Sequence, residues 1–403
     1  MYCKQKASLI ALIAAIALLF VGCDCGKGGG DNSGSTSDST SVPIEIIEPT
    51  SEIEIEVKTK EYGSENGTVN DAIERAYSAV YELKATSPAL EVLCSAVAVF
   101  NAVITQTDAE GVEESGDYTY FATCLSLIEG ATDFTLTSPT GEKITAYFVG
   151  ADPNTDIALL SAEGRMTPVE FIDDSGKVQL TDQMFVIGIP FNAGAGVVRN
   201  TYLGAKEHSV IIGSSSRNLM TVSDELDNGY TGGAAYVKNG GVFVGMIADV
   251  GDVETNGYTF VIPSRIVCDI SVSLAQTQTE TSYGFVEGSY YLGAVFGDSK
   301  MSSSPYVYVS SIDDAGCLYK GGLRELDKIT RVAYVPYGES AEKSFIEVTS
   351  SSQVAEYINA LQLKIGDKLL FKCIRGGLST LRSVEITQYI YGETEAPPAE
   401  DDE

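Results

Sequence analysis

Histidine and basic residues are scarce in this chain of 403 residues. It has one histidine, His208, and 26 lysines and arginines against 56 aspartates and glutamates, a formal charge of −30. A site that needs an imidazole base therefore has a single candidate. So large a negative charge argues against binding to nucleic acid and against electrostatic attachment to anionic lipid. We expect neither a metal nor a cofactor, and the 44% hydrophobic content is enough to form buried cores.

The first 22 residues have the pattern of a targeting segment. Two lysines precede an apolar run over 7–21, which is too short for a comfortable membrane span. The run ends in Phe20-Val21-Gly22-Cys23, which resembles a bacterial lipoprotein cleavage box. We therefore predict a lipoprotein signal peptide over 1–22 and lipidation of Cys23, which would anchor the chain to the extracytoplasmic side of a bacterial cell membrane. An ordinary signal peptide and a short anchor helix are the alternatives.

The two ends of the mature chain are predicted to be solvated. Residues 23–65 are predicted to form a flexible tether, because Gly, Ser, Asp, Asn and Thr dominate its first part. Ile and Glu then alternate over 53–57, the period of a strand with one apolar face. That stretch is either an arm that pairs with the edge of a domain or a stiffened linker. Residues 391–403 are predicted to be an acidic tail.

Short β-type runs follow one another at roughly ten-residue spacing, which predicts a sandwich or a barrel. They are found at 79–83, 97–100, 118–123, 134–137 and 144–149. Further along, Gly229, Gly232 and Gly233 surround Thr231. A tight glycine turn that presents one side chain and its own N–H groups is what an acyl-transfer site needs. A plain glycine hairpin between two strands is the structural alternative.

Five stretches resemble, in the same order, the HtrA-type proteases, in which a trypsin-like double β-barrel precedes a PDZ domain. The resemblance covers residues 66–275 and implies an all-β fold of that architecture. The five stretches are 121–131, similar to the block around the catalytic histidine; 150–160, similar to the block with the catalytic aspartate; 185–191; the turn at 229–233, similar to Gly-x-Ser-Gly-Gly; and 258–264.

The resemblance assigns a role to each position of a catalytic triad. It places Ser126 at the base position, Asp156 at the acid position and Thr231 at the nucleophile position, with Gly229 and Thr231 forming the oxyanion hole. A serine cannot take up a proton near neutral pH. We therefore predict a pseudoprotease in which Asp156 has a structural, hydrogen-bonding role. His208 could serve as a surrogate base, but this is the less favoured alternative. We expect His208 to be an exposed or capping residue on a hairpin.

Cysteines 94, 124, 268, 317 and 373 form an odd set outside the amino terminus. Cys124 lies two residues from Ser126 and is an alternative nucleophile, but it too would lack a base. We expect a buried thiol. A Cys94–Cys124 disulfide is an option that the sequence leaves open.

After a polar linker at 276–282, residues 284–390 resemble a PDZ domain with two helices. The matching stretches are 290–296, 314–323, 349–361 and 365–377. In such domains a peptide's free carboxylate meets backbone N–H groups of a loop, and the peptide adds as a strand. The residues implied in peptide binding are Tyr291, Leu292, Gly293, Ala294, Val295 and Phe296. A PDZ fold that packs on the barrel without binding peptide is the alternative.

Together these features predict a membrane-tethered, HtrA-like pseudoprotease that binds polypeptide segments or a partner protein in the cell envelope. An active serine-type endopeptidase of envelope protein quality control is one alternative. A non-catalytic subunit of an HtrA-type assembly is another. By resemblance only, the protein is expected to form a homo- or hetero-trimer.

Overall fold

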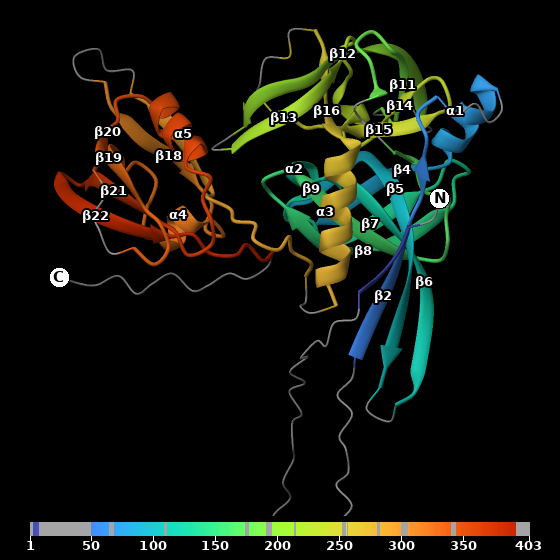
Figure 1. The fold of residues 1–403 in the computed structure, drawn as a ribbon, viewed down its shortest axis with the longest axis horizontal. Coiled ribbons are helices and arrows are strands. Elements are labelled where there is room, and N and C mark those ends of the chain that lie inside the picture. The colour runs from blue at the N-terminus through green and yellow to red at the C-terminus, as the bar shows by residue number, and fades with distance from the viewer. Residues whose placement is uncertain are drawn as a thin grey trace, which may run out of the picture.

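The computed structural model describes residues 3–7, 50–63, 68–108, 111–173, 177–190, 196–212, 215–251, 255, 257–279, 283–299, 305–339 and 344–391. The predicted cleavage box with Cys23 and nearly all of the predicted acidic tail lie outside these residues. Two β-barrels pack together, and a smaller domain lies beside them (Figure 1). The prediction of an all-β fold, a trypsin-like double barrel followed by a PDZ domain, is confirmed. Among the described residues, no helix has the length and apolar character to cross a membrane.

Six strands close the first barrel. They pair in the order β5-β4-β7-β8-β9-β6, and the β5–β6 pairing completes the ring. Alternate side chains point inward, so Leu83, Phe121 and Leu136 are fully buried. Helix α1 (Val69–Tyr77) precedes them, capped by Thr68. The strands are β4 (Val80–Ser87), β5 (Leu90–Thr107), β6 (Glu113–Cys124), β7 (Asp133–Thr137), β8 (Lys143–Asp152) and β9 (Ile157–Glu163).

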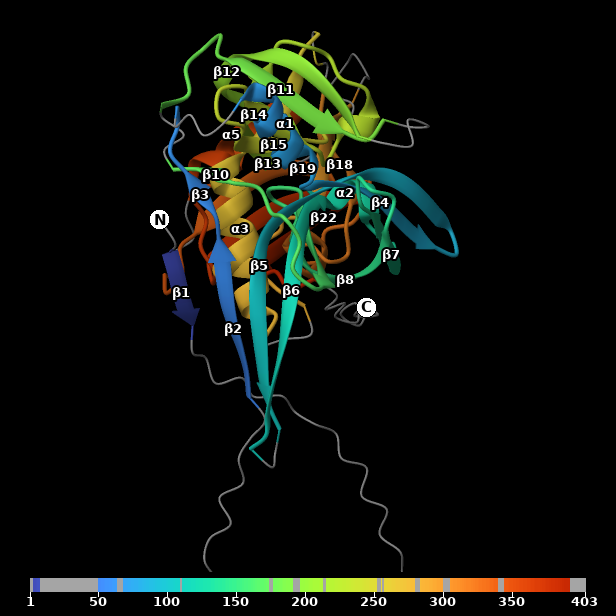
Figure 2. The same ribbon diagram turned by 90° about the vertical axis from the view of Figure 1, so that its right-hand side faces the viewer.

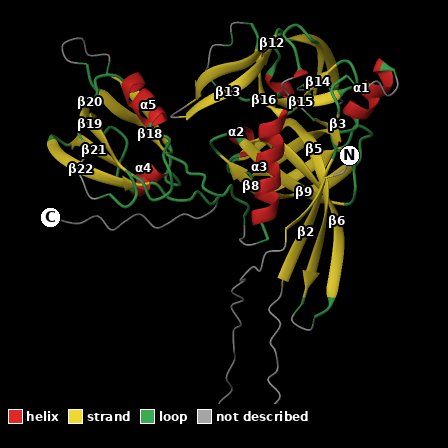
Figure 3. Cartoon of the chain, viewed as in Figure 1, coloured by secondary structure: helices red, strands yellow, loops and turns green. Residues whose placement is uncertain are grey.

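The second barrel has the same plan. Its ring runs β14-β11-β12-β13-β16-β15 and is closed by the β14–β15 pairing. Helix α3 (Ser264–Thr277) contacts strands of both barrels (Figure 3). Short strands β10 (Phe171–Ile172) and β3 (Thr59–Lys60) extend the sheet. The ring strands are β11 (Gln183–Gly188), β12 (Val197–Ile212), β13 (Ser215–Val222), β14 (Ala234–Val237), β15 (Val242–Ile247) and β16 (Thr259–Pro263).

The predicted flexible tether is wrong for residues 50–57 and 59–60, which form strands β2 and β3. Strand β2 (Thr50–Val57) pairs antiparallel with β5, and β1 (Cys3–Ala7) pairs with β2 (Figure 2). The side chains of Ile53 and Ile55 are only 5% and 4% exposed. The alternating stretch is thus an arm on the edge of the domain. It finds a partner because β5, with 18 residues, extends beyond the barrel.

The third sheet belongs to the PDZ domain. Its strands run in the order β17-β18-β19-β21-β22, so β17 is an edge strand, and β20 pairs with β19. The predicted serine-capped helix is confirmed as α5, where the Ser350 side chain accepts from Gln353 N. Because α3 continues to Thr277, the predicted linker at 276–282 begins inside a helix. The elements are β17 (Ala294–Asp298), β18 (Val307–Ile312), α4 (Cys317–Lys320), β19 (Lys328–Val335), β20 (Ile346–Glu347), α5 (Ser351–Ala360), β21 (Lys368–Arg375) and β22 (Leu378–Glu385).

Candidate functional site

Asp156 lies at the end of the turn that joins β8 to β9. Its φ angle is +62°, a left-handed conformation that aspartate tolerates better than most residues. From there it accepts a hydrogen bond from Ser126 N through Oδ1 at 2.8 Å, and its carbonyl oxygen accepts from Leu125 N at 3.0 Å. Both donors lie in the first turn of α2 (Leu125–Ile128), where N–H groups lack helical partners. Asp156 therefore caps the short helix that presents Ser126.

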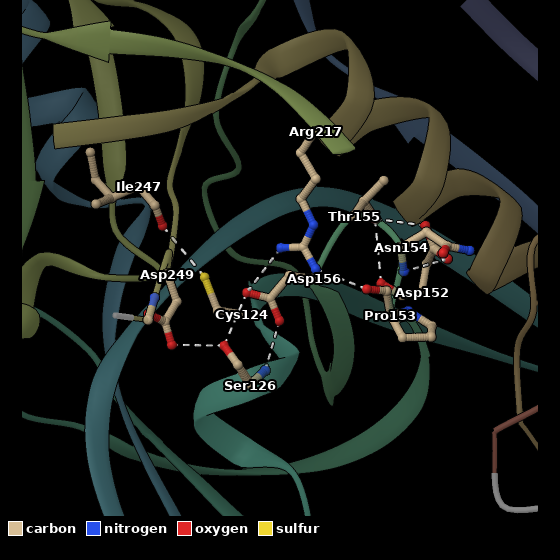
Figure 4. Close-up of polar contacts among 11 residues, drawn as sticks. Cys124, Ser126, Asp152, Pro153, Asn154, Thr155, Asp156, Arg217, Ile247 and Asp249 are labelled. Carbon is tan, nitrogen blue, oxygen red and sulfur yellow. Dashed lines mark hydrogen bonds and ion pairs between the residues drawn. The ribbon is translucent and has the colours of Figure 1, made fainter. Parts of the chain in front are cut away.

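The hydroxyl group of Ser126 lies between two carboxylates (Figure 4). Its Oγ is 3.0 Å from Asp156 Oδ2 and 2.9 Å from Asp249 Oδ2. A serine hydroxyl has one proton and can donate it to one carboxylate only. Both contacts are hydrogen bonds at the same time only when one of the two carboxyl groups is itself protonated and donates to Oγ. The cluster therefore has a place for one extra proton.

Arg217, from the start of β13, places a cation beside this cluster. Its guanidinium group donates to Pro153 O at 3.0 Å and lies 3.8 Å from Asp156 Oδ2. Within the described part of the chain, its buried Nε has no hydrogen-bond partner. Burial raises the pKa of Asp156 to about 6, although the hydrogen bond from Ser126 N and the charge of Arg217 act in the opposite direction. Desolvation of the carboxylate thus outweighs its polar contacts.

We expect the stability of the protein to depend on pH through Asp156. Its folded pKa of about 6 lies above the ordinary value of 3.8, so folding favours the protonated form. That stabilisation is fully present below pH ~4 and is lost as pH rises through ~6, a change of about 3 kcal/mol. Asp156→Asn should remove this dependence in urea unfolding, whereas exposed Asp133→Asn should not. A difference in the free energy of unfolding between Asp156→Asn and the wild type that stays constant from pH 4.5 to 7.5 would contradict this prediction.

Thr231 lies in the glycine turn, which follows the 3₁₀ turn Asn228–Tyr230. It is 8% exposed, and among the described residues its hydroxyl group makes no hydrogen bond. The turn packs closely against the first barrel, because a Cβ on Gly232 would lie 2.2 Å from Ser95 O. An open cleft beside the turn is lined by Pro190 and residues 225–229. The structure thus joins Ser126 to Asp156 but joins neither to the Thr231 hydroxyl.

The predicted oxyanion hole is not formed in this structure. The N–H group of Gly229 donates to Asp227 Oδ1 at 3.1 Å, and that of Thr231 donates to Asn228 O at 3.1 Å. Both donors that would hold an oxyanion are therefore already used within the turn. The reason is local: Asp227 is the N-cap of the 3₁₀ turn, and the turn itself occupies the second N–H.

Cys124 is a buried thiol, as predicted. Cys94, Cys124, Cys268, Cys317 and Cys373 are all free, so the Cys94–Cys124 disulfide does not form. Cys124 is completely buried, and its Sγ lies 3.5 Å from Ile247 O. Burial raises its pKa well above the ordinary value, as burial also raises the pKa of Cys94 to about 12. Neither sulfur is a nucleophile near neutral pH, because the thiolate is the reactive form.

His208 lies on β12 in the β12–β13 hairpin, where it is half-buried rather than exposed. Its ring packs against those of Tyr258 and Phe260, with centroids 5.7 and 5.4 Å apart. Among the described residues, no hydrogen bond joins His208 to Thr231 or Asp156. It pairs with Leu219 in the middle of the β12–β13 ladder, so it is neither a helix cap nor a turn residue. The environment is that of a packing residue.

The predicted carboxylate loop of the PDZ domain presents free backbone donors. Its carbonyl groups are occupied: Tyr291 O accepts from Cys317 N at 2.8 Å, Leu292 O from Leu318 N at 3.1 Å and Gly293 O from Asp313 N at 2.7 Å. In contrast, the N–H groups of Leu292 and Gly293 donate to no group in the described residues. Gly293 has φ +71°, and a Cβ there would lie 2.7 Å from Gly316 Cα. The loop can therefore offer two N–H groups to an anion.

The sequence interpretation missed Asp249 and Arg217. Asp249 follows strand β15 and Arg217 lies near the start of β13, positions more than 90 residues after Ser126 along the chain. No motif marks either residue, because their role comes from the closure of the second barrel against the first. Among the described residues, no group of His, Cys, Asp and Glu side chains is arranged to hold a metal ion.

Residues 109–246 match the model of the trypsin-like peptidase domain. The chain therefore contains a trypsin-like peptidase domain related to that of the HtrA-type serine proteases. The chain is 24% identical over 285 residues to the periplasmic serine endoprotease DegP of Escherichia coli K12. The aligned region covers 69% of this chain and 56% of DegP. It is 23% identical over 297 residues to the serine protease Do-like HtrB of Bacillus subtilis, covering 68% of this chain and 61% of HtrB.

The chain thus spans less than two thirds of the length of these curated relatives. Among solved structures, a serine endoprotease from Yersinia pestis superposes with a TM-score of 0.45 and 18% identity, covering 81% of this chain and 99% of that one.

Proposed function

We propose that this protein is an HtrA-like pseudoprotease of the bacterial cell envelope that binds polypeptide segments through its PDZ domain without hydrolysing them. The observation that carries the proposal is the Ser126 cluster, in which a hydroxyl group takes the place where the related enzymes need a base. A general base must take up the nucleophile's proton and return it to the leaving group. The serine hydroxyl cannot do so near neutral pH, and Asp156 is engaged in capping α2.

Two further observations support the same proposal. Within the described part of the chain, Thr231 has no hydrogen-bonded partner that would activate it, and both predicted oxyanion donors are occupied. Among the same residues, two N–H groups of the PDZ loop have no acceptor, and the adjacent strand β17 pairs on one edge only. A peptide that adds to this edge with its carboxylate at the loop would use only backbone groups that the chain retains.

The second candidate function is that of an active serine endopeptidase, favoured by the names of the relatives, several of which are serine endoproteases. A third candidate is a non-catalytic subunit that assembles with an active homologue. Hydrolysis of unfolded protein by the purified chain, lost on Thr231→Ala, would replace the proposal with the second candidate. Co-purification with an active homologue, and no peptide binding by the isolated chain, would favour the third.

Peptide capture can be tested by the chemistry of the carboxylate. A peptide with a free, apolar carboxy terminus should bind with micromolar affinity, because its carboxylate would accept from Leu292 N and Gly293 N. Its amidated twin should bind at least about tenfold more weakly, since charge-assisted hydrogen bonds contribute ~1.5–3 kcal/mol. Isothermal titration of both forms measures the difference. Equal affinities would exclude carboxylate recognition.

Attachment to the membrane is proposed from the cleavage box and from the periplasmic location that the DegP relatives' names state. Cys23→Ala should prevent lipidation and either block processing or release the chain into the soluble fraction, because acyl chains supply the apolar area that anchors it. Ser33→Ala, in the same stretch, is the control. Unchanged fractionation and migration of Cys23→Ala would show that Cys23 is not lipidated.

A further inference from the structure

The last described residues of the chain leave the PDZ sheet and return to the barrels. We call residues 386–391 the clasp. Ile386 is still fully buried in the PDZ core. Tyr389 N then donates to Ser289 O at 3.0 Å, and the Gln388 side chain donates to Val286 O at 2.7 Å and accepts from Gly288 N at 2.8 Å. The clasp thus runs beside the segment that enters the PDZ domain.

That entering segment is itself fixed to the first barrel. Gly284 N donates to Val149 O at 2.7 Å, and Gly284 forms a parallel bridge with Gly150. A Cβ on Gly284 would lie 2.0 Å from Leu274 O, so the segment fits tightly between β8 and α3. Phe285 N also donates to Thr277 Oγ1 at 2.7 Å. The connection between the domains is therefore anchored rather than free.

Tyr391 completes the contact with the barrel. Its ring packs against Phe148 of β8 and Tyr283 of the connection, with centroids 4.6 and 5.7 Å away. Tyr391 also packs against the hydrophobic core of the first barrel, in the cluster that contains Leu125 and Ile128 of α2. The clasp thus joins the PDZ domain to the barrel beside the helix of Ser126.

The clasp also supports the carboxylate loop. The rings of Tyr389 and Tyr291 meet edge to face, with centroids 5.7 Å apart. On the other side of the loop, the Asn154 side chain of the β8–β9 turn donates to Tyr290 O. Tyr290 and Tyr291 are therefore held between the clasp and the turn that carries Asp156.

From these contacts we propose that the clasp is a positioning element. It docks the PDZ domain on the first barrel and keeps the carboxylate loop in the geometry that receives a peptide. Docking can be tested whether or not peptides bind, whereas the effect on affinity rests on the proposed function. Tyr391 touches the barrel and not the loop, which lets one substitution separate docking from direct contact with the ligand.

The test uses Tyr391→Ala in the full chain, with Tyr337→Ala as the matched control, since Tyr337 is 78% exposed on the same domain. Limited proteolysis with a protease of broad specificity should cut the entering segment at 283–286 on the order of tenfold faster in Tyr391→Ala than in the control, because Tyr391 packs on Tyr283. Tyr391→Phe keeps the ring but loses the partly buried hydroxyl group, whose pKa is raised by burial, and it should give an intermediate rate.

The same variants are then titrated with the free-carboxylate peptide. Tyr391→Ala should bind about threefold or more weakly than wild type, because the loop loses its support from the barrel. Circular dichroism shows whether each variant is folded. If Tyr391→Ala is not folded, the cleavage rate and peptide affinity of Tyr391→Phe test the proposal instead. If the Tyr391 variants were cleaved at the same rate as Tyr337→Ala, the proposed role of the clasp would be wrong. Faster cleavage with no peptide binding even by the wild type would leave the docking intact and overturn the proposed function.

Discussion

The purified wild-type protein is expected not to react with a serine-directed fluorophosphonate and not to cleave unfolded protein. In triad enzymes, removal of the nucleophile or the base alone lowers kcat by roughly 10⁶, and the proposal places Thr231 and Ser126 at these two positions. Gel-based labelling at micromolar probe, beside an active HtrA-type enzyme, measures this directly. Labelling that disappears in Thr231→Ala would contradict the pseudoprotease proposal.

The stronger form of this prediction restores the missing groups. Ser126→His would place an imidazole between the two carboxylates that now meet the serine hydroxyl, and Thr231→Ser would remove a methyl group from the nucleophile. Because triad members act as a unit, the double variant should react with the fluorophosphonate faster than either single variant does. Its gain remains limited as long as Gly229 N donates to Asp227.

A third substitution tests that limit. Asp227→Ala removes the acceptor at 3.1 Å from Gly229 N, so this N–H becomes free to hold an oxyanion. Removal of one oxyanion donor from an active enzyme costs about 10²–10³ in kcat, so the triple variant should exceed the double variant by a large fraction of that factor. Asp224→Ala, which leaves the Gly229 N–H group bonded to Asp227, is the matched control. A triple variant no faster than the double one would mean that the glycine turn does not form the oxyanion hole.

Asp327→Ala is expected to destabilise the PDZ domain by about 3 kcal/mol. The Asp327 carboxylate is fully buried and accepts from Arg375 Nε and Nη2, both at 2.7 Å, and from Arg324 N at 3.0 Å. Its loss removes two hydrogen bonds of the Arg375 guanidinium group, which keeps the one to Gly322 O, and removes the acceptor of Arg324 N. Because the side chain of Arg375 is 40% exposed, water compensates part of the loss, which places the effect at the lower end for buried ion pairs.

The control for this prediction is an exposed ion pair of the same domain. Glu347 lies 2.5 Å from Arg331 Nη2 and its side chain is 72% exposed, so Glu347→Ala should cost less than ~1 kcal/mol. Urea unfolding followed by tyrosine fluorescence suits a chain that has 22 tyrosines and no tryptophan. Equal midpoints for the two variants would show that the buried network does not stabilise the domain.

The sequence by itself determined the fold. Strand periodicity predicted a sandwich or a barrel, and the serine cap predicted α5. The resemblance of five stretches to the HtrA-type proteases implied the double barrel, and that of four later stretches implied the PDZ domain. These features are readable because they are local: a period of two, a cap or a glycine turn is contained within a few residues. The proposed exchange of the expected base for Ser126 likewise concerns a single position.

Only the tertiary structure decided what surrounds those groups. Asp249 and Arg217 reach the Ser126 cluster from the second barrel, Asp227 takes the N–H of Gly229, and Tyr391 returns to the first barrel from the far end of the chain. The alternation over 53–57 was compatible with an arm or a linker until the overlong β5 supplied its partner. Contacts between segments separated by tens to hundreds of residues depend on how barrels close and domains dock, and no local pattern records that geometry.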